Sequence, residues 1–340
     1  MNTLSNIAST LAKTPKKWLV TGGAGFIGSN LAEFLLLAKQ DVTVLDNLST
    51  GYQKNIDTLK SIADKEKANF TFIKGDIVDY QTCLNATKAQ DFILHQAALG
   101  SVPRSIELPL DSHLNNVDGT LNVFLAAKEN GIQRVVYASS SSVYGDSQEM
   151  PKVEDVIGTP LSPYAITKLV NEVYAKNFSQ IYGIEMIGLR YFNVFGPRQD
   201  PDGAYAAVIP KWIKSLIQDQ PVSIFGDGET SRDFCYIQNV VLMNILASLK
   251  TNKNAINQVY NVACNERTTL NDLYKIIVAE LKAHHPHVEN MKAEYKDFRP
   301  GDIRHSLANI EKAQKLLNYA YSHTLQQGMK ESIPWYINNI

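Results

Sequence analysis

The residues best suited to chemistry are a tyrosine and a lysine four positions apart, preceded in the chain by a run of serines. Tyr164 and Lys168 lie in Tyr-Ala-Ile-Thr-Lys, and this spacing places both side chains on one face of a helix. A free tyrosine has a pKa of about 10 and is a poor base at neutral pH, but a nearby ammonium stabilises the phenolate. Ser140 and Ser141 belong to the serine run, and a hydroxyl there could hydrogen-bond the same substrate oxygen. We therefore predict that Ser140, Ser141, Tyr164 and Lys168 form a catalytic group that removes a proton from a hydroxyl.

A second pattern predicts a dinucleotide as the partner of this group. The run Thr-Gly-Gly-Ala-Gly-Phe-Ile-Gly at residues 21–28 follows an apolar segment and opens an amphipathic one. Glycines let the chain turn tightly and approach a pyrophosphate, and the following helix offers free N–H groups and a positive dipole end. Asp46 closes the next apolar segment, at the distance where an acid accepts hydrogen bonds from the adenosine ribose. A carboxylate there would repel a 2′-phosphate, so NAD is favoured over NADP, and its positive nicotinamide would further lower the pKa of Tyr164.

A third segment extends the predicted cofactor site. Gly75-Asp76-Ile77 could hold the adenine, although Asp76 could equally be a turn residue or a helix cap. The residues predicted to contact NAD are Gly22, Gly25, Phe26, Ile27, Gly28, Asp46, Asn47, Asp76, Ile77, Tyr164 and Lys168.

Alternation of short apolar runs with longer amphipathic segments must position these residues. Unbroken apolar strands between helices are typical of a parallel sheet, so we predict an α/β fold with a Rossmann-type doubly wound parallel sheet. The expected strands are Lys17–Thr21, Asp41–Asp46, Phe70–Lys74, Asp91–His95, Val135–Ser139, Glu185–Arg190 and Val259–Val262. The expected helices are Phe26–Lys39, Asp111–Asn130, Ser162–Tyr182, Tyr205–Gln218 and Thr269–Lys282. Glycine, proline and aspartate become frequent after about Asn193. This shift predicts an NAD-binding domain over 1–192, with a return segment near 239–264, and a smaller α/β substrate-binding lobe over 193–340.

Composition excludes several classes of protein. The chain has 340 residues, 33 Lys plus Arg against 34 Asp plus Glu, and a net charge of −1, so binding to nucleic acid or to an anionic membrane is disfavoured. Three widely spaced cysteines, Cys83, Cys235 and Cys264, form neither a disulfide framework nor a metal motif, and they indicate buried thiols in the cytoplasm. The cluster of histidines at 284–287 has no companion ligand and is expected in a loop, so no metal site is predicted. The polar N-terminus is expected to pack on the surface or to be partly disordered.

These motifs together resemble the extended short-chain dehydrogenase/reductase family that acts on nucleotide sugars. The resemblance runs from Lys17 onward and includes the stretches Arg190–Pro197, Ser231–Phe234 and Arg299–Asp302. It implies a UDP-sugar substrate. It also implies that Asn193, Arg232 and Arg299 contact the diphosphate, Asp302 the uridine ribose and Phe225 the uracil. Two arginines suit a diphosphate because each guanidinium can form a bidentate fork. The family further implies a homodimer built on the helices at 111–130 and 162–182.

The reaction is narrowed by the residues after the serine strand. Family members begin by oxidising the sugar at C4, and the 4,6-dehydratases and decarboxylases then use carboxylates where this chain has Ser141-Ser142. Serine cannot replace a carboxylate as a proton shuttle near neutral pH. The remaining fate is return of the hydride to the other face of the keto sugar, which is 4-epimerisation.

The sugar is indicated by a small residue at a position that gates the pocket in the family. Ser306 stands there, and a serine leaves room for a 2-acetamido group. By resemblance to bacterial epimerases of surface-polysaccharide synthesis, the acetamido pocket comprises Gly100, Ser101, Ser141, Asn193, Gln199, Ala207 and Ser306. We predict interconversion of UDP-GlcNAc and UDP-GalNAc. The uronic acids UDP-GlcNAcA and UDP-GalNAcA remain an alternative, for which Arg104 is a candidate cation near C6. A reductase, a dehydratase or a non-catalytic NAD-binding protein are further alternatives.

Overall fold

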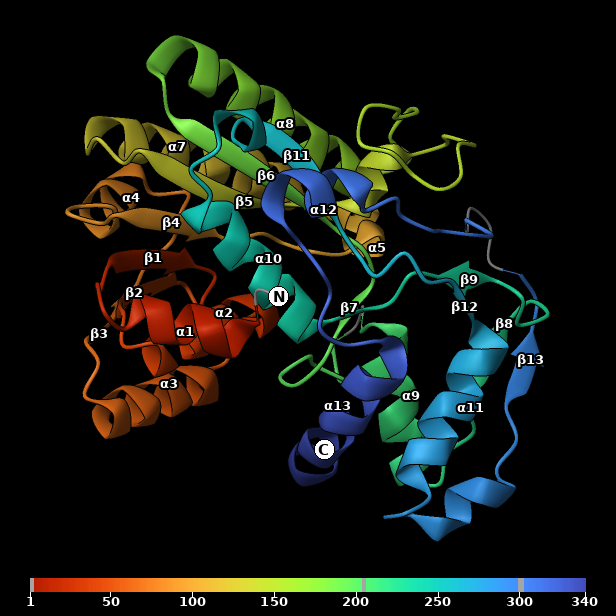
Figure 1. Cartoon of the computed structure of the whole chain (residues 1–340). Coiled ribbons are helices and arrows are strands. Elements are labelled where there is room, and N and C mark those ends of the chain that lie inside the picture. The colour runs from red at the N-terminus through yellow and green to blue at the C-terminus, as the bar shows by residue number, and fades with distance from the viewer. Residues whose placement is uncertain (1–2, 204–205, 299–302) are drawn as a thin grey trace.

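A seven-stranded parallel sheet forms the centre of the molecule (Figure 1). The computed structural model describes residues 3–203, 206–298 and 303–340. The sheet has the order β11-β6-β5-β4-β1-β2-β3. Its strands are β1 (Lys17–Thr21), β2 (Asp41–Asp46), β3 (Phe70–Lys74), β4 (Phe92–His95), β5 (Arg134–Ser140), β6 (Glu185–Tyr191) and β11 (Gln258–Val262). The predicted Rossmann-type sheet is confirmed, including the late strand that pairs with β6. The domain boundary at 192 and 193 stays a prediction.

The two faces of the sheet bury separate cores. Alternate residues of a strand point to opposite faces, so Trp18 and Val20 of β1 join one core while Leu19 joins the other. The first core also takes apolar residues from α2 (Phe26–Leu37), α3 (Gln53–Glu66) and α10 (Ile237–Leu249). The second takes them from α4 (Tyr80–Ala86), α7 (Gly119–Glu129) and α8 (Pro163–Tyr182). Helices on both faces explain why the strands are rich in apolar residues.

The helix expected over 111–130 is a composite. After α5 (Val102–Glu107), the chain forms α6 (Pro109–His113), a π-helical segment η1 (Leu114–Asp118) and then α7. A π-bulge widens the turn and redirects the side chains within it. Here it accompanies the burial of Asn116, whose side chain hydrogen-bonds both backbone groups of Leu99, at 2.7 and 3.0 Å. The predicted helical stretch is therefore present, with a π-helical segment at residues 114–118.

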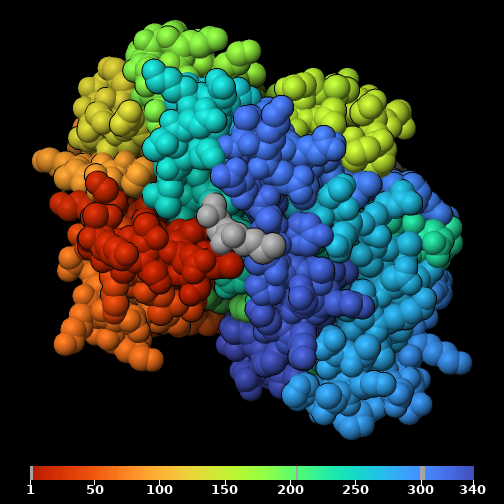
Figure 2. All heavy atoms as spheres, in the orientation of Figure 1, coloured from red at the N-terminus to blue at the C-terminus, as the bar shows by residue number. Residues whose placement is uncertain are grey.

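The chain after β6 adds short strands and helices outside the main sheet (Figure 1). In the same orientation, Figure 2 shows the C-terminal part of the chain in blue on the opposite side of this face from the N-terminal part in red. The short pairs are β7 (Val194–Phe195) with β10 (Cys235–Tyr236), β9 (Ser231–Arg232) with β12 (Thr268–Thr269), and β8 (Ser223–Phe225) with β13 (Glu294–Lys296). The helices are α9 (Val208–Ile217), α11 (Leu270–Leu281), α12 (Glu311–Leu317) and α13 (Leu325–Asn339), with the 3-10 turns η2 (Ser141–Tyr144), η3 (Lys253–Ala255) and η4 (Pro286–Asn290). The expected helix at 205–218 thus spans 208–217, and Tyr205 lies outside the described residues.

The N-terminal segment packs on the sheet domain. α1 (Leu4–Leu11) buries Ile7 and Leu11, and the fully buried Gln40 donates from Nε2 to the Leu11 carbonyl at 3.1 Å. Packing on the surface was one of the two expectations for this segment.

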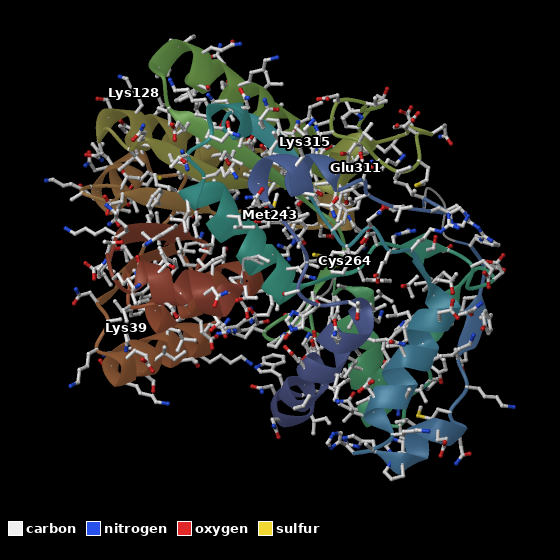
Figure 3. The ribbon with its side chains drawn as sticks, viewed as in Figure 1. Lys39, Lys128, Met243, Cys264, Glu311 and Lys315 are labelled. Carbon is white, nitrogen blue, oxygen red and sulfur yellow. The ribbon has the colours of Figure 1, made fainter. Side chains whose placement is uncertain are left out.

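The structure also bears on the predictions about membrane-spanning helices, cysteines and metal ligands. None of the described helices is long and apolar enough to cross a bilayer. All three cysteines are buried and unbridged, and Cys264 is labelled in Figure 3. Within the described ranges, no three His, Cys, Asp or Glu side chains gather in a way that could hold a metal ion.

Candidate active site

The turn from β1 into α2 has the geometry that a close-lying phosphate requires. Gly22 has a φ of +70°, and a Cβ there would lie 2.7 Å from the backbone nitrogen of Ala97. A Cβ on Gly28 would lie 2.2 Å from the carbonyl oxygen of Gly22. Only glycine fits either position. α2 begins at Phe26 with Gly25 as its N-cap and no side-chain cap among the described residues, so its first N–H groups can serve an anion.

A cavity of about 450 Å³ adjoins this turn at the carboxyl ends of β1 and β2. Nine of the eleven residues predicted to contact the cofactor line it: Gly22, Gly25, Phe26, Ile27, Gly28, Asp46, Asn47, Asp76 and Ile77. Four residues predicted for the substrate line it too: Gly100, Ser101, Gln199 and Ala207. The structure therefore brings together segments that the sequence separates by more than a hundred residues.

The acid at the end of β2 is buried and holds the glycine turn. Asp46 accepts hydrogen bonds from the N–H of Ala24 at 2.9 Å and of Leu48 at 2.8 Å, one on each carboxylate oxygen. Burial raises the pKa of Asp46, and the two backbone hydrogen bonds oppose that rise. Each oxygen keeps a second lone pair for a ligand hydroxyl. Asp76 accepts from Asn47 Nδ2 at 2.8 Å and from the N–H of Val78 at 2.9 Å, so it is a turn residue as well as a wall of the cavity.

Tyr164 and Lys168 lie together at the start of α8. Lys168 Nζ is 5.8 Å from the centroid of the tyrosine ring and donates to the carbonyl oxygen of Ala138 on β5 at 3.0 Å. Burial lowers the pKa of Lys168 to about 8. Burial also raises the pKa of Tyr164, and a hydrogen bond with the Ser140 side chain partly offsets the rise. The pKa of Tyr164 is therefore raised even with the Lys168 ammonium nearby, and the predicted lowering depends on this ammonium and the positive nicotinamide together.

The pair sits directly behind the wall of the cavity. The N–H of Tyr164 donates to Ser105 Oγ at 3.0 Å, and Ser105 belongs to α5. Ser101, the N-cap of α5, and Arg104 line the cavity itself. Tyr164 and Lys168 do not line the cavity themselves.

The serine strand end is locked by buried polar contacts. Ser140 Oγ accepts from the N–H of Ser142 at 3.1 Å and lies 2.9 Å from Ser142 Oγ, so it caps η2, which begins at Ser141. Ser139 Oγ donates to Glu172 of α8 at 2.5 Å. Glu172 is also the partner of the buried Arg190, with contacts of 2.7 and 2.9 Å. Glu172 thereby joins β5, β6 and α8 beside Ser140, one of the two serines predicted to be catalytic.

A second buried network under α8 was missed by sequence reasoning. His95 lies between Thr21 Oγ1 at 2.7 Å and Thr120 Oγ1 at 2.9 Å, and burial lowers its pKa to about 3. Asn116 donates to Thr167 Oγ1 at 3.2 Å, and Thr167 donates to the carbonyl of Tyr164 at 2.7 Å. Polar side chains on an otherwise apolar helix face were the feature of the sequence that could have revealed this network. Its contacts connect the glycine turn to the start of α8.

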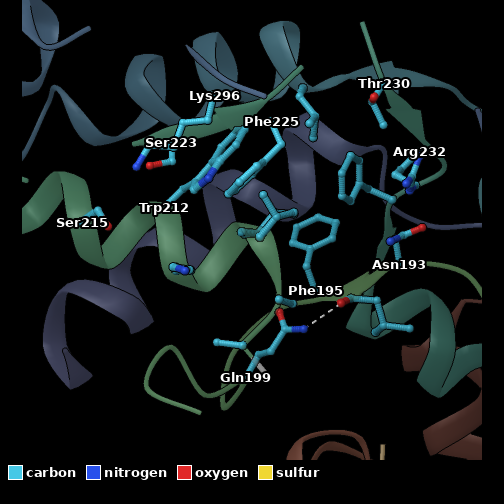
Figure 4. Close-up of a pocket in the computed structure, with 18 of the residues that line it drawn as sticks. Asn193, Phe195, Gln199, Trp212, Ser215, Ser223, Phe225, Thr230, Arg232 and Lys296 are labelled. Atoms are coloured by element: carbon cyan, nitrogen blue, oxygen red, sulfur yellow. Dashed lines mark hydrogen bonds between the residues drawn. The ribbon is translucent and has the colours of Figure 1, made fainter. Parts of the chain in front are cut away.

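A second cavity, of about 460 Å³, lies between α9 and the short strands that follow β6 (Figure 4). It contains five residues predicted for the substrate: Asn193, Gln199, Ala207, Phe225 and Arg232. The lining residues that were not predicted include Trp212, Ser215, Ser223, Thr230 and Lys296. Gln199, Ala206 and Ala207 line both cavities, so the two adjoin. Gln199 Nε2 donates to the Val194 carbonyl at 2.9 Å, while its buried Oε1 has no hydrogen-bond partner among the described residues.

The aromatic and cationic groups of this second cavity come from distant segments. In Figure 4, Phe225 and Trp212 lie on one side, while Arg232 stands above Asn193 on the other. Arg232 Nη1 donates to the Ser231 carbonyl at 2.9 Å, which holds the guanidinium at the strand end. A planar ring surface beside a cationic group suits a nucleotide diphosphate.

Of the remaining four predicted substrate residues, Ser141 and Ser306 line neither cavity. Ser306 is beside β9, where its N–H donates to the Ser231 carbonyl at 3.1 Å. Arg299 and Asp302 lie outside the described residues.

Comparison with known proteins identifies the family. Residues 18–263 match the model of the NAD dependent epimerase/dehydratase family. This chain belongs to that family. The match includes the glycine turn, the serine strand and the Tyr164–Lys168 pair, so the resemblance read from the motifs is confirmed.

Relatives within the NAD-dependent epimerase/dehydratase family share the whole fold. A UDP-N-acetylglucosamine 4-epimerase from Methanobrevibacter ruminantium M1 is 39% identical with a TM-score of 0.87, covering 96% of this chain and 99% of that one. A UDP-glucose 4-epimerase from Thermotoga maritima is 32% identical with a TM-score of 0.85, covering 95% and 99%. A UDP-glucuronate 4-epimerase from Thermodesulfobacterium geofontis is 33% identical over 327 residues, 95% of this chain and 97% of the relative. The three names share a UDP-sugar and a 4-epimerisation but differ in the sugar.

The cofactor that this family requires fits the first cavity. The glycine turn leaves no space for a Cβ at Gly22 or Gly28, which keeps the backbone close to the cavity. Asp46 stands where a ribose hydroxyl would be bound, and the N-terminus of α2 stands where a pyrophosphate would be bound. The donor set therefore matches NAD.

Proposed function

We propose that this protein is an NAD-dependent 4-epimerase that interconverts UDP-GlcNAc and UDP-GalNAc through a 4-keto sugar. The observation that carries the proposal is the arrangement of two adjoining cavities with Ser140, Tyr164 and Lys168 behind the wall of the first. One cavity has the lining of a dinucleotide site and the other that of a nucleotide diphosphate site. A sugar bound between them would have its ring next to the catalytic helix.

Each catalytic residue has a distinct part in this proposal. Tyr164 takes the proton from the sugar hydroxyl, Ser140 hydrogen-bonds the same oxygen, and the Lys168 ammonium stabilises the phenolate. The chemistry that bound NAD supplies is hydride acceptance at C4 and return of the hydride to the opposite face. Because burial raises the pKa of Tyr164, the base needs the positive charge of the oxidised cofactor nearby before it can ionise.

Epimerisation is favoured over dehydration by the side chains at the end of β5. Dehydration needs an acid and a base, and Ser141 and Ser142 occupy the positions of the dehydratase carboxylates. Glu172, one helical turn beyond Lys168, is already held by Ser139 and Arg190 in the core. It is a structural carboxylate rather than a proton shuttle.

The acetamido group is supported by small residues around the shared wall. Gly100, Ser101 and Ala207 line the first cavity, and a Cβ built on Gly100 would meet no heavy atom within 4 Å. We include Ser306 in this pocket from its family position. We assign Asn193, Arg232 and Arg299 to the diphosphate, Phe225 to the uracil and Asp302 to the uridine ribose.

A uronic acid substrate is the second candidate. Arg104 lines the same cavity as Ser101, and a guanidinium there could pair with a carboxylate at C6. On this reading the enzyme would interconvert UDP-GlcNAcA and UDP-GalNAcA. Both substrates would serve precursor synthesis for a surface polysaccharide in the cytoplasm.

A homodimer is part of the proposal because the catalytic helix carries exposed apolar side chains. Ile166, Val173 and Ile181 of α8 are 51%, 62% and 62% exposed. Leu110 and Leu114, on the neighbouring α6 and η1, are 77% and 44% exposed. Several exposed apolar side chains on neighbouring helices are typical of a protein–protein interface. A dilution series in analytical ultracentrifugation tests it, and a fully active monomer at assay concentration contradicts it.

The deciding experiment separates the reaction from the substrate. The purified holoenzyme is incubated with UDP-GlcNAc, UDP-GlcNAcA or UDP-Glc, without added NADH, and products are resolved by NMR. We expect the C4 epimer of UDP-GlcNAc. Turnover of UDP-Glc alone, or turnover that needs soluble NADH, would contradict the proposal. Preference for UDP-GlcNAcA would select the second candidate.

A further inference from the structure

Beside the cofactor cavity, side-chain contacts join two segments that are far apart in the sequence. The proposed reaction does not use these contacts. One side consists of Asn30 and Glu33 on α2 and of Tyr52, which precedes α3. The other side is the turn after β7, with Pro197, Arg198 and Asp200. We call these six residues the clasp.

The first half of the clasp binds the turn to the helix that begins at the glycine motif. Asn30 donates from Nδ2 to the Pro197 carbonyl at 3.1 Å and accepts from Arg198 Nη2 at 3.0 Å. Arg198 also forms an ion pair with Glu33. Asn30 is 6% exposed and the Arg198 side chain 11%, so these contacts are largely shielded from water. Shielded, charge-assisted contacts are stronger than exposed ones.

The second half of the clasp binds the same turn to the loop after β2. Tyr52 donates its hydroxyl to Asp200. That hydrogen bond, with burial and the charges of Asp200 and Asp202, raises the pKa of Tyr52 to about 12, so the phenol remains a donor throughout the neutral range. Tyr52 is itself anchored, because its N–H donates to the Ala24 carbonyl at 3.1 Å in the glycine turn.

The turn side of the clasp is equally well anchored. The Tyr336 hydroxyl donates to the Gly196 carbonyl at 3.0 Å, and Lys214 of α9 pairs with Asp202. The clasp therefore joins two segments that are each anchored to the rest of the protein by contacts of their own.

Both segments that the clasp joins contribute to the wall of the cavity that fits NAD, and Asp200 is the clasp residue that lines it. Ser49 and Thr50 line it from the loop that ends at Tyr52, and Gln199 and Asp200 line it from the turn. A dinucleotide leaving between these walls would have to part them, which breaks the Tyr52–Asp200 bond, the Arg198 contacts or both.

We propose that the clasp retains NAD between the two hydride transfers by holding the cavity walls together. An enzyme that returns a hydride to its own substrate gains nothing from cofactor exchange, and losing the reduced cofactor mid-cycle would strand the oxidised sugar. Asn30, Tyr52, Arg198 and Asp200 are retention residues, separate from those that contact the reacting atoms. The inference rests on the family's NAD dependence and not on the identity of the sugar.

The test measures cofactor exchange without any sugar present. Purified holoenzyme is mixed with excess isotope-labelled NAD, and uptake of label is followed by rapid filtration and mass spectrometry. Tyr52→Phe and Arg198→Met each remove one half of the clasp and should speed exchange about tenfold, as expected for loss of one hydrogen-bonded contact with a charged group. The double variant should be faster than either, since both halves close the same opening.

A matched control is available in the same chain. Tyr321 donates its hydroxyl to Glu266 at 3.0 Å, outside the cavity, so Tyr321→Phe removes a similar tyrosine–carboxylate bond and should leave exchange unchanged. Asp200→Asn provides a second, near-isosteric change to the clasp. Wild-type exchange in Tyr52→Phe, Arg198→Met and Asp200→Asn would overturn the proposal, and so would equal acceleration in Tyr321→Phe. A chain that epimerises no UDP-sugar but shows clasp-dependent exchange would refute the proposed function alone.

Discussion

Replacing Gly28 by alanine should empty the cofactor site while leaving the rest of the fold in place. The added Cβ would lie 2.2 Å from the carbonyl oxygen of Gly22, 2.7 Å from its carbonyl carbon and 2.8 Å from the Cα of Gly23. Carbon atoms pack at about 3.5–4.0 Å, so the two backbone segments must separate by about 1 Å. No flexible side chain can yield, because all three atoms belong to the backbone.

The cost of this separation can be expressed as an affinity. Overpacking of a closely packed site costs about 1–3 kcal/mol. Gly22 and Gly28 line the cofactor cavity, so the displacement falls on the backbone that approaches the pyrophosphate. If NAD must restore the native turn to bind, that cost corresponds to about a 5- to 150-fold loss in affinity. The assay is the NAD content of the purified protein, followed by calorimetric titration of the stripped protein.

Gly328→Ala is the matched control. Gly328 lies within α13, and its added Cβ would meet Tyr236 ring and Cβ atoms at 2.5 and 2.6 Å, away from the cofactor cavity. Both variants should unfold at lower temperature, but only Gly28→Ala should lose NAD. A Gly28→Ala protein with wild-type NAD affinity would refute the close-approach argument. Equal loss of NAD in Gly328→Ala would attribute the effect to general destabilisation.

Four further outcomes are expected. Tyr164→Phe should lower kcat by about 100-fold or more while the NAD content stays at the wild-type level, and normal turnover would remove the tyrosine from the mechanism. Ser306→Tyr should lower kcat/KM for UDP-GlcNAc by about tenfold or more relative to UDP-Glc in parallel assays, and unchanged selectivity would place the gate elsewhere. Glu172→Gln leaves the Arg190 charge buried without its partner and should lower the free energy of unfolding by about 3–5 kcal/mol in urea titrations, whereas Glu129→Gln, in an exposed pair, should not change it measurably. The pKa of His95 is lowered to about 3 in the native protein and is about 6.5 in the unfolded chain, so only the unfolded chain binds a proton between these pH values. The free energy of unfolding should therefore fall as the pH drops below 6.5. His95→Asn should make this dependence shallower in denaturation series from pH 4 to 7.

The sheet was predictable because its strands are short local segments rich in apolar residues. β1, β2 and β3 have the predicted bounds, although Thr43 and Thr71 interrupt the apolar residues of β2 and β3. The two-residue pairs such as β7 with β10 were not predictable, because two residues carry no periodicity and their pairing depends on contacts across the chain. The π segment at 114–118 was missed for a similar reason. Its cause is the contact of Asn116 with Leu99, which no helical period encodes.

The candidate site likewise contains residues that could be predicted from the sequence and residues that could not. Residues within compact motifs, such as Gly22 to Gly28 or Tyr164 with Lys168, could be assigned because the motif itself brings them together. Trp212 and Lys296 could not be assigned from the sequence, because they line the second cavity from a helix and a strand and are 84 positions apart (296 − 212). The clasp was invisible for the same reason: Tyr52 and Asp200 are 148 residues apart in the chain.

This division has a chemical counterpart. In the proposed function the motif residues approach the phosphate and remove the proton, and both steps rely on groups a few positions apart. Under the same proposals, retention of the cofactor and fit of the sugar depend instead on where the turn after β7 meets α2 and the loop after β2. That turn contributes Gln199 to both cavities and Asp200 to the clasp, so one segment bears on substrate contact and on cofactor release. A change in this turn should therefore alter sugar preference and NAD exchange together, whereas a change in the Tyr164 motif should alter turnover alone.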